Sequence, residues 1–171
     1  MRTIEVSLYK FNELSEEAKE KAVQNLYDIN VDYEWWCHTY EDAEQIGLKI
    51  TGFDLDRNRH ATGDLLLSAA EVAQNILNNH GEQCSTCQTA QSFLDTFTPL
   101  FAEYMDETSE HYESYEREQE LNDLETEFLN ELLEDYSIML QNESEYLTSE
   151  EAIIETIEAN EYEFLGNGEL A

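Results

Sequence analysis

The segment HGEQCSTC brings three residues with metal-binding side chains, His80, Cys84 and Cys87, into eight consecutive positions. Zinc prefers tetrahedral sites of sulfur and nitrogen ligands, and a Cys-x2-Cys pair supplies two of them from one turn. A fourth ligand would have to come from Cys37, His38 or elsewhere. The alternative is that Cys84 and Cys87 lie near a helix start without metal. A thioredoxin-like dithiol is disfavoured because no strand directly precedes the pair.

Other constellations with chemical potential are weaker. The segment DLDRN begins like a calcium loop at Asp54, but Arg59 stands where such a loop needs glycine, and Leu65 stands where it needs a bidentate glutamate. A hairpin turn accounts for these residues better. The chain has no GxSxG motif and no glycine-rich phosphate loop. We therefore expect no enzymatic activity and no cofactor; the alternative is a structural zinc at His80, Cys84 and Cys87.

Hydrophobic alternation and capping signals predict the elements of the first third of the chain. Residues 3–9 place Ile4, Val6 and Leu8 on one face, which is typical of a strand. A helix is predicted to start at Ser15, which is followed by two glutamates in the first turn. A second helix is predicted over residues 32–46, ending before Gly47. Residues 48–57 and 62–69 then predict a hairpin, with a bulge at Gly52.

The remainder of the chain has a helical pattern. Ser68 and Glu71 form a capping box, and Gly81 closes the helix that follows. Pro99 and the polar stretch near Ser149 interrupt the pattern, and residues 161–165 predict a short strand. The sequence therefore predicts an α+β fold: a small N-terminal antiparallel sheet with helices in residues 1–81, followed by an acidic, mainly helical portion in residues 82–171. We expect the two portions to form one compact unit.

Charge is the most unusual property of the chain. Its 171 residues include 40 Asp and Glu against 8 Lys and Arg, which gives a formal net charge of −32. Residues 61–171 contain Arg117 as their single base. Such a chain repels nucleic acids and anionic lipids and attracts basic clefts. No apolar run approaches the length of a membrane span, the N-terminus lacks a signal-peptide pattern, and the three cysteines fit a reducing compartment, so we expect a cytoplasmic protein.

The acids of residues 113–136 are regularly spaced. Apolar residues recur at steps of three or four and predict one buried helical stripe, made of Leu121, Leu124, Phe128, Leu132, Tyr136 and Met139. Acids with the same rhythm predict a stripe on the solvent side, here called the acidic stripe: Glu116, Glu120, Asp123, Glu127, Glu131 and Glu134. It spans roughly 27 Å, or about 5 Å per charge, which is similar to the roughly 3.4 Å per charge of one DNA strand. The alternative is a solvated helix face with no binding role.

The acids continue before the stripe and are mixed with aromatic residues. We expect the partner-binding surface to include the acidic stripe and five preceding acids, Glu103, Asp106, Glu107, Glu110 and Glu113. Tyr104, Tyr112 and Tyr115 lie among them and could add flat contact area, or could instead line the helix packing surface. Trp35 and Trp36 point about 100° apart on a helix, so they cannot both lie at the centre of one apolar stripe. One of them could therefore anchor a partner. The alternative places one in the core and the other at the sheet edge.

In size, acidity and unpaired helical carboxylates, the chain resembles the acidic DNA-mimic inhibitors that phages and plasmids make against restriction and CRISPR systems. Its residues 3–36 (TIEVSLYKFNELSEEAKEKAVQNLYDINVDYEWW) also resemble the start of small phage and prophage proteins labelled as antitoxins. Both resemblances imply a mobile-element protein, working in the host cell cytoplasm, that binds and neutralises another protein.

These observations lead to one leading hypothesis and one alternative. The first is a non-enzymatic anti-CRISPR or anti-restriction inhibitor that mimics nucleic acid and blocks the basic nucleic-acid-binding channel of a host defence protein. It would contact neither nucleic acid nor membrane, and burial of apolar stripes could also make it a homodimer. The alternative is an antitoxin or adaptor that binds a protein partner through Trp35, Trp36 and Tyr40.

Overall fold

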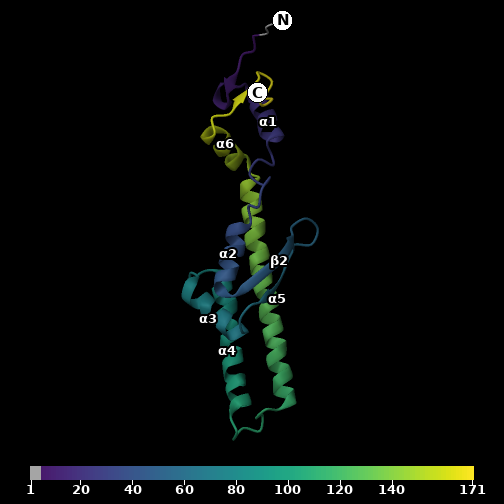
Figure 1. The fold of residues 1–171 in the computed structure, drawn as a ribbon, viewed down its shortest axis with the longest axis vertical. Coiled ribbons are helices and arrows are strands. Elements are labelled where there is room, and N and C mark those ends of the chain that lie inside the picture. Colours follow the sequence, from purple (N-terminus) through teal and green to yellow (C-terminus); the bar gives the residue numbers. More distant parts are fainter. Residues whose placement is uncertain (1–4) are drawn as a thin grey trace. The chain divides into compact units, whose positions relative to one another are not determined.

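A computed structural model describes residues 5–171 and divides the chain into two units (Figure 1). The terminal unit combines the described part of Met1–Trp35 with Asn142–Ala171, and the central unit is Trp36–Gln141. The predicted α+β class is confirmed, because helices dominate and the strands of the described chain form two antiparallel two-stranded sheets. The division does not fall at residue 81, where the sequence analysis placed it, because the helices on either side of that residue pack together in the central unit.

The terminal unit joins the two ends of the described chain. Its elements are β1 (Tyr9–Lys10), the 3-10 helix η1 (Phe11–Glu13), α1 (Glu16–Asn25), α6 (Glu150–Ala159) and β4 (Glu163–Phe164). β1 pairs antiparallel with β4, so that Tyr9 lies opposite Phe164. The core of this unit consists of Phe11, Leu14, Ala18, Ala22, Ile153, Ile157 and Phe164.

Serine caps start both helices of the terminal unit. Ser15 Oγ accepts a hydrogen bond from the Ala18 backbone N–H at 3.3 Å, and Ser149 Oγ accepts one from the Ala152 N–H at 3.3 Å. Each cap satisfies a backbone donor that has no partner within its helix. The two helix starts predicted from these serines are therefore confirmed.

The central unit contains the hairpin and the long helices. It consists of α2 (Cys37–Ile46), β2 (Leu48–Asp54), β3 (His60–Leu65), α3 (Ala69–Asn79), α4 (Ser85–Met105) and most of α5 (Tyr115–Leu147). The register of the β2–β3 pair shifts between Ile50 and Gly52, which confirms the predicted bulge. Gly47 ends α2 with a φ of 94°, a left-handed conformation that favours glycine.

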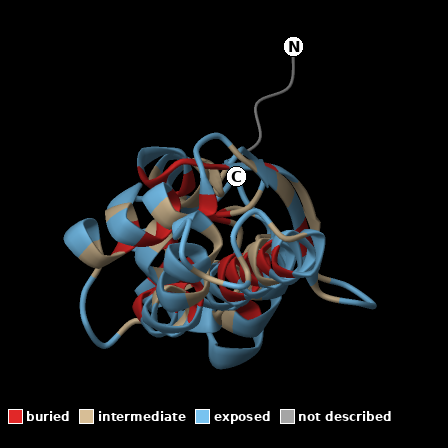
Figure 2. Cartoon of the chain, turned by 90° about the horizontal axis from the view of Figure 1, so that it is seen from below, coloured by how far each residue is buried: buried red, intermediate tan, exposed pale blue. Residues whose placement is uncertain are grey.

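Helices α4 and α5 run side by side as a helical hairpin, here called the α4–α5 hairpin (Figure 1). Phe93 of α4 stacks on Phe128 of α5 with ring centroids 4.4 Å apart. Leu132 and Tyr136 are fully buried on the same face of α5. Buried residues face the interior between the elements, whereas the outer helix faces are exposed (Figure 2). The hairpin therefore presents one face of each helix to solvent.

Several element boundaries differ from the sequence predictions; the strands of the β2–β3 pair, for example, are Leu48–Asp54 and His60–Leu65 rather than residues 48–57 and 62–69. The strand predicted over residues 3–9 is wrong for its described part, because Val6 and Leu8 are 59% and 47% exposed and β1 begins only at Tyr9; Ile4 lies outside the described residues. The helix predicted from residue 32 begins at Cys37. Pro99 does not interrupt α4, because it lies on an exposed part of the helix while Phe93 and Phe97 anchor the buried face.

Candidate partner-binding surface

The acidic stripe lies on α5 as predicted. Its six carboxylates are all exposed, whereas Leu121, Phe128, Leu132 and Tyr136 are buried. One predicted apolar position is wrong, since Met139 is 38% exposed. The packing explains the exposure: α4 covers one side of α5 and the β2–β3 hairpin approaches from another, so the intervening strip of helix surface faces solvent.

Arg117 holds the two helices of the α4–α5 hairpin together beside the turn that connects them. Its guanidinium donates to Glu103 Oε2 on α4 at 2.7 Å and to Glu120 Oε2 on α5 at 2.6 Å. The arginine is only 8% exposed, and its Nε has no hydrogen-bond partner within residues 5–171. The one base of residues 61–171 is thus used as a structural clamp. The signal for it in the sequence was the i,i+3 spacing to Glu120.

Arg59 neutralises the other end of the acidic stripe. From the residue just before β3 it pairs with Glu134, donates to Ser137 Oγ at 3.1 Å and donates to Gln141 Oε1 at 2.8 Å. Two of the six stripe carboxylates are therefore ion-paired. The other four, Glu116, Asp123, Glu127 and Glu131, form no ion pair with any Lys, Arg or His of the described residues.

A shallow groove runs beside the last part of the acidic stripe. Glu131 and Glu134 line one wall with Asn130, and Gln88, Thr89 and Ser92 of α4 line the other. The cavity volume is about 570 Å³. Asp135 at its base is buried and accepts a hydrogen bond from Thr89 Oγ1 at 2.8 Å. Carboxylates therefore face uncharged hydroxyl and amide groups, an arrangement that suits a cationic side chain.

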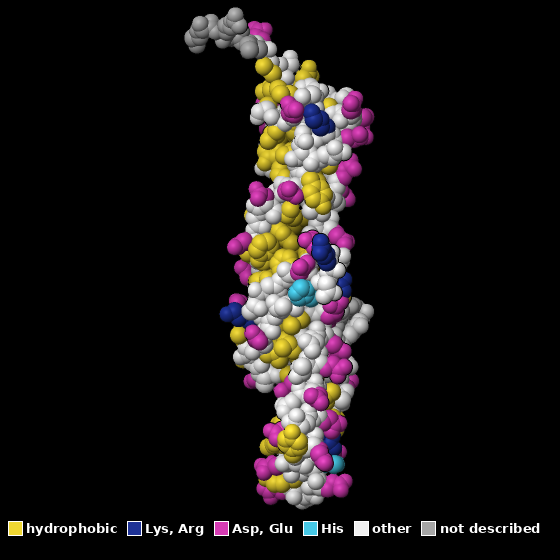
Figure 3. Space-filling model, turned by 90° about the vertical axis from the view of Figure 1, so that its right-hand side faces the viewer, with side chains coloured by type: hydrophobic (Ala, Val, Ile, Leu, Met, Phe, Trp, Pro, Cys, Tyr) yellow, Lys and Arg dark blue, Asp and Glu magenta, His cyan; other side chains and the backbone are white. Residues whose placement is uncertain are grey.

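The turn between α4 and α5 combines charge with exposed apolar side chains. Phe101, Met105 and Tyr115 are 44%, 57% and 72% exposed. Acidic and hydrophobic side chains lie next to each other at this end of the central unit (Figure 3). Tyr104 is half-buried, so of the three predicted contact tyrosines it is the one that packs against the core.

The five acids that precede the stripe have different local roles. All are exposed, but Glu103 is held by Arg117. Asp106 accepts hydrogen bonds from the Thr108 backbone N–H and hydroxyl, which lower the pKa of its carboxyl. The charge of Glu113 in turn raises the pKa of the Tyr112 phenol. Glu107 and Glu110 complete the group, and Glu110 lies 3.7 Å from the His111 ring.

The tryptophan pair is divided between the two units. Trp35 belongs to the terminal unit and Trp36 to the central unit, and both are half-buried. The Trp36 ring meets Phe53 of β2 edge-on, with centroids 5.5 Å apart. Trp36 therefore packs at the small sheet, as the alternative in the sequence analysis expected for one of the pair, while neither indole is fully buried.

The residues considered as zinc ligands do not form a tetrahedral set. His80 Nδ1 lies 2.8 Å from Thr86 Oγ1, and its Nε2 faces Asp42 at 3.6 Å. Within residues 5–171 no group of three or more His, Cys, Asp or Glu side chains is arranged to hold a metal ion. The geometry gives no support to a structural zinc. In the turn between β2 and β3, the Asp54 carboxylate accepts a hydrogen bond from the Asp56 backbone N–H at 2.9 Å. This is a local turn contact rather than a calcium loop.

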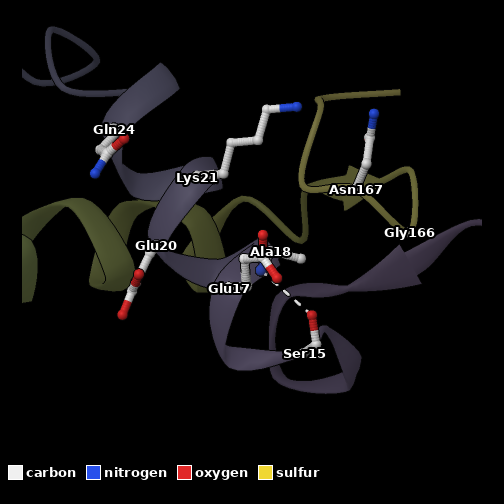
Figure 4. A pocket seen from close by; sticks show the side chains of 8 residues that line it. All are labelled: Ser15, Glu17, Ala18, Glu20, Lys21, Gln24, Gly166 and Asn167. Carbon is white, nitrogen blue, oxygen red and sulfur yellow. Dashed lines mark hydrogen bonds between the residues drawn. The ribbon is translucent and has the colours of Figure 1, made fainter.

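The terminal unit has a polar groove between α1 and the turn after β4 (Figure 4). It is lined by Ser15, Glu17, Ala18, Glu20, Lys21, Gln24, Gly166 and Asn167, with a cavity volume of about 520 Å³. Lys21 is already paired with Glu169 at 3.3 Å, and Ser15 caps α1. These contacts give the groove a structural role at the helix start.

Comparison of the chain with protein-family models, with curated proteins and with solved structures found no match. Among the helices in residues 5–171, none is both long enough and apolar enough to cross a membrane. The proposals below therefore depend on the geometry and charge of this chain alone.

Proposed function

We propose that this protein is a non-enzymatic inhibitor that mimics nucleic acid and occupies the basic nucleic-acid-binding channel of a host defence protein, such as a CRISPR effector or a restriction enzyme. The observation that carries the proposal is the row of exposed carboxylates on α5, four of which have no ion-pair partner in the described chain. The proposal places the protein in the cytoplasm of the cell whose defence it blocks.

The spacing of the charges supports this kind of partner. From Glu116 to Glu134 the helix rises roughly 27 Å, which is comparable with the length of about eight nucleotides of one DNA strand. A rigid helix holds its carboxylates in register, so a channel lined with Lys and Arg can pair with several of them at once. Because such pairs are exposed at the rim, they raise the association rate and make it fall with salt.

The surroundings of the stripe add contacts other than charge. An arginine that reaches Glu131 can also donate to the amide and hydroxyl oxygens of Gln88 and Ser92 across the groove. At the α4–α5 turn, Phe101 and Tyr115 offer exposed aromatic area beside carboxylates. Aromatic side chains supply much of the desolvated contact at protein interfaces.

The test is a competition assay with purified CRISPR effector and restriction complexes and labelled target DNA. The stripe variant carries Glu116→Gln, Asp123→Asn, Glu127→Gln and Glu131→Gln. The matched control carries Glu20→Gln, Glu44→Gln, Glu143→Gln and Glu158→Gln, which are exposed positions outside the stripe with the same total charge change. At about 0.5 kcal/mol for each exposed pair, the stripe variant should lose roughly 2 kcal/mol, or about thirtyfold in affinity, while the control keeps wild-type displacement of DNA.

Two results would reject the proposal. Equal losses of affinity in the stripe variant and the control would mean that only the net charge matters. If the wild-type protein displaces DNA from neither the CRISPR effector nor the restriction complexes, the proposed targets are excluded. A change in the salt dependence of inhibition limited to the stripe variant would support direct pairing of these carboxylates.

The partial exposure of both tryptophans supports a second candidate, an antitoxin or adaptor that binds a protein partner through aromatic anchors. Under this proposal Trp35→Ala or Trp36→Ala weakens binding and the stripe variant does not. The opposite pattern in the same binding assay would reject it.

A further inference from the structure

The pair Cys84 and Cys87 lies at the start of α4. Cys84 is the N-cap residue with extended backbone angles, and Cys87 is in the first turn of the helix, so one turn brings both thiols to the same helix end. Cys84 is half-buried, whereas Cys87 is only 5% exposed and donates to the Ile76 carbonyl at 3.8 Å. The thiols are thus close together but unequal in access.

A chain of polar groups connects Cys84 to the carboxylate of Asp42. The Cys84 sulfur lies 3.1 Å from Thr86 Oγ1, which lies 2.8 Å from His80 Nδ1. His80 Nε2 faces Asp42 Oδ2 at 3.6 Å, and the Tyr136 hydroxyl donates to the same oxygen at 2.8 Å. In this arrangement the thiol proton can pass through the Thr86 hydroxyl to His80, whose other ring nitrogen faces the Asp42 carboxylate. The residues form a relay that favours the Cys84 thiolate.

The two thiols also differ in acidity. Burial opposes ionisation of Cys84, but hydrogen bonding, first of all with the Thr86 hydroxyl, outweighs it and lowers the pKa of the Cys84 thiol. Burial, together with the interaction with Cys84, raises the pKa of the Cys87 thiol to about 11. This division matches a nucleophilic and a resolving cysteine. The ionisable groups near the pair are His80, Glu82 and Tyr136, and Asp42 contacts both His80 and Tyr136.

A groove begins at Cys87, three residues after Cys84. Cys87 lines it together with Leu77 of α3 and with Glu82, Gln88, Gln91, Ser92 and Asp95, and its cavity volume is about 690 Å³. Its charged lining groups are both carboxylates, and its amide and hydroxyl groups can bind polar chains. A positively charged disulfide is therefore favoured there over a negatively charged one.

We propose that Cys84 and Cys87 form a thiol–disulfide exchange site whose preferred substrates are cationic disulfides. The Cys84 thiolate attacks one sulfur of the substrate disulfide, forming a mixed disulfide and releasing the other half as a thiolate that takes up a proton. The Cys87 thiol then loses its proton to solvent and attacks Cys84. The mixed disulfide breaks and its second half leaves as a thiol. The protein dithiol is oxidised by two electrons and the substrate is reduced to two thiols.

The site belongs to the chain itself and does not depend on the proposed inhibitor function. The sequence analysis disfavoured a dithiol because no strand precedes the pair, and that argument concerned only resemblance to thioredoxin. The arrangement of Thr86, His80 and Asp42 around Cys84 depends on three elements of the central unit, and no local sequence signal contains it.

The test uses full-length protein carrying Cys37→Ser, so that only the pair remains, and three small disulfides as probes: cationic cystamine, neutral hydroxyethyl disulfide and anionic glutathione disulfide. Intact-mass spectrometry should show loss of two hydrogens without a lasting adduct. In the variant that also carries Cys87→Ser, the mixed disulfide should be trapped on Cys84. In the variant that carries Cys84→Ser in its place, an adduct should form on Cys87 at least tenfold more slowly. Cystamine should react fastest, with an advantage that falls as salt rises.

Thr86→Val tests the relay, with Ser85→Ala as the matched control on the exposed neighbouring position. The valine should move the pH midpoint of Cys84 alkylation upward by about 0.7, the effect of one lost hydrogen bond, while the control leaves it unchanged. Circular dichroism checks that each variant is folded. Three results would overturn the exchange site: equal reactivity of the two cysteines, a permanent adduct in place of the Cys84–Cys87 disulfide, or formation of that disulfide only in denaturant. Equal rates with all three probes would overturn the cationic preference.

Discussion

The clamp around Arg117 predicts an asymmetry between removing the base and removing its acids. The Arg117 side chain is 9% exposed, whereas the side chains of Glu103 and Glu120 are 52% and 53% exposed. In Arg117→Met the two hydrogen bonds are lost, but the carboxylates return to water and the cost of burying a charge disappears. In the double variant Glu103→Ala/Glu120→Ala the guanidinium remains buried without an anionic partner. The second change should therefore destabilise the protein more.

The magnitudes follow from the burial of each group. Two charge-assisted hydrogen bonds are worth about 1.5–3 kcal/mol each before desolvation is subtracted, and the desolvation of a buried guanidinium costs several kcal/mol. We expect Arg117→Met to cost about 0–2 kcal/mol of unfolding free energy. The double alanine variant should cost about 2–4 kcal/mol, somewhat less than a fully enclosed pair because the shortened side chains admit water.

Urea denaturation followed by far-ultraviolet circular dichroism measures both changes. Glu116→Ala/Glu127→Ala is the control, because it makes the same charge change on α5 at exposed residues outside the clamp. It should alter stability by no more than about 0.5 kcal/mol. A larger loss of stability in Arg117→Met than in the double alanine variant would contradict this asymmetry, as would a control that loses as much stability as the double alanine variant.

Tyr136→Phe should cost about 1–2 kcal/mol, because it removes the 2.8 Å hydrogen bond to Asp42. Burial and the bond to Asp42 raise the pKa of Tyr136, so the stabilisation from its neutral phenol is complete below the unfolded pKa near 10 and is lost as pH rises above it. Urea titrations should show this alkaline loss of stability in the wild-type protein and less of it in Tyr136→Phe. Identical pH profiles of the two proteins would contradict the prediction. Gly168→Ala should open the terminal unit, because φ is +82° and an added Cβ would come within 2.2 Å of the Ala18 carbonyl oxygen. Hydrogen exchange of the α1 amides should increase strongly in this variant but not in Gly166→Ala, and equal exchange in both would contradict the prediction.

Local signals in the sequence were sufficient to predict several elements of the fold. The capping box of Ser68 and Glu71 forms with both of its reciprocal hydrogen bonds, and Gly47 ends α2 in the left-handed conformation. Each of these features depends on a few neighbouring residues, so the sequence contains all the information needed. The regular spacing of acids on α5 likewise predicted which side of the helix is exposed, because helical periodicity alone assigns the faces.

Features that depend on distant residues could not be predicted. The alternation in residues 3–9 suggested a longer strand, but β1 pairs only where Tyr9 and Lys10 meet β4 near the other end of the chain. The ion pair of Arg59 and Glu134 joins residues far apart in sequence, so the neutralisation of that end of the stripe was not foreseen. The role of the stripe in binding stays a prediction.

The burial of Arg117 gives the helical hairpin a built-in proteolytic reporter. Trypsin cleaves only after Lys and Arg, and between Arg59 and Ala171 the chain contains no other such residue. Cleavage at Arg117 requires its side chain, 8% exposed in the folded protein, to leave both carboxylates and enter the protease. The rate of this single cut therefore measures how often the turn between α4 and α5 opens, and a partner bound over the turn would slow it. It also means that fragments from a tryptic digest of this half are few and long, so mapping of the Cys84–Cys87 disulfide is better done with a protease that cleaves after Glu.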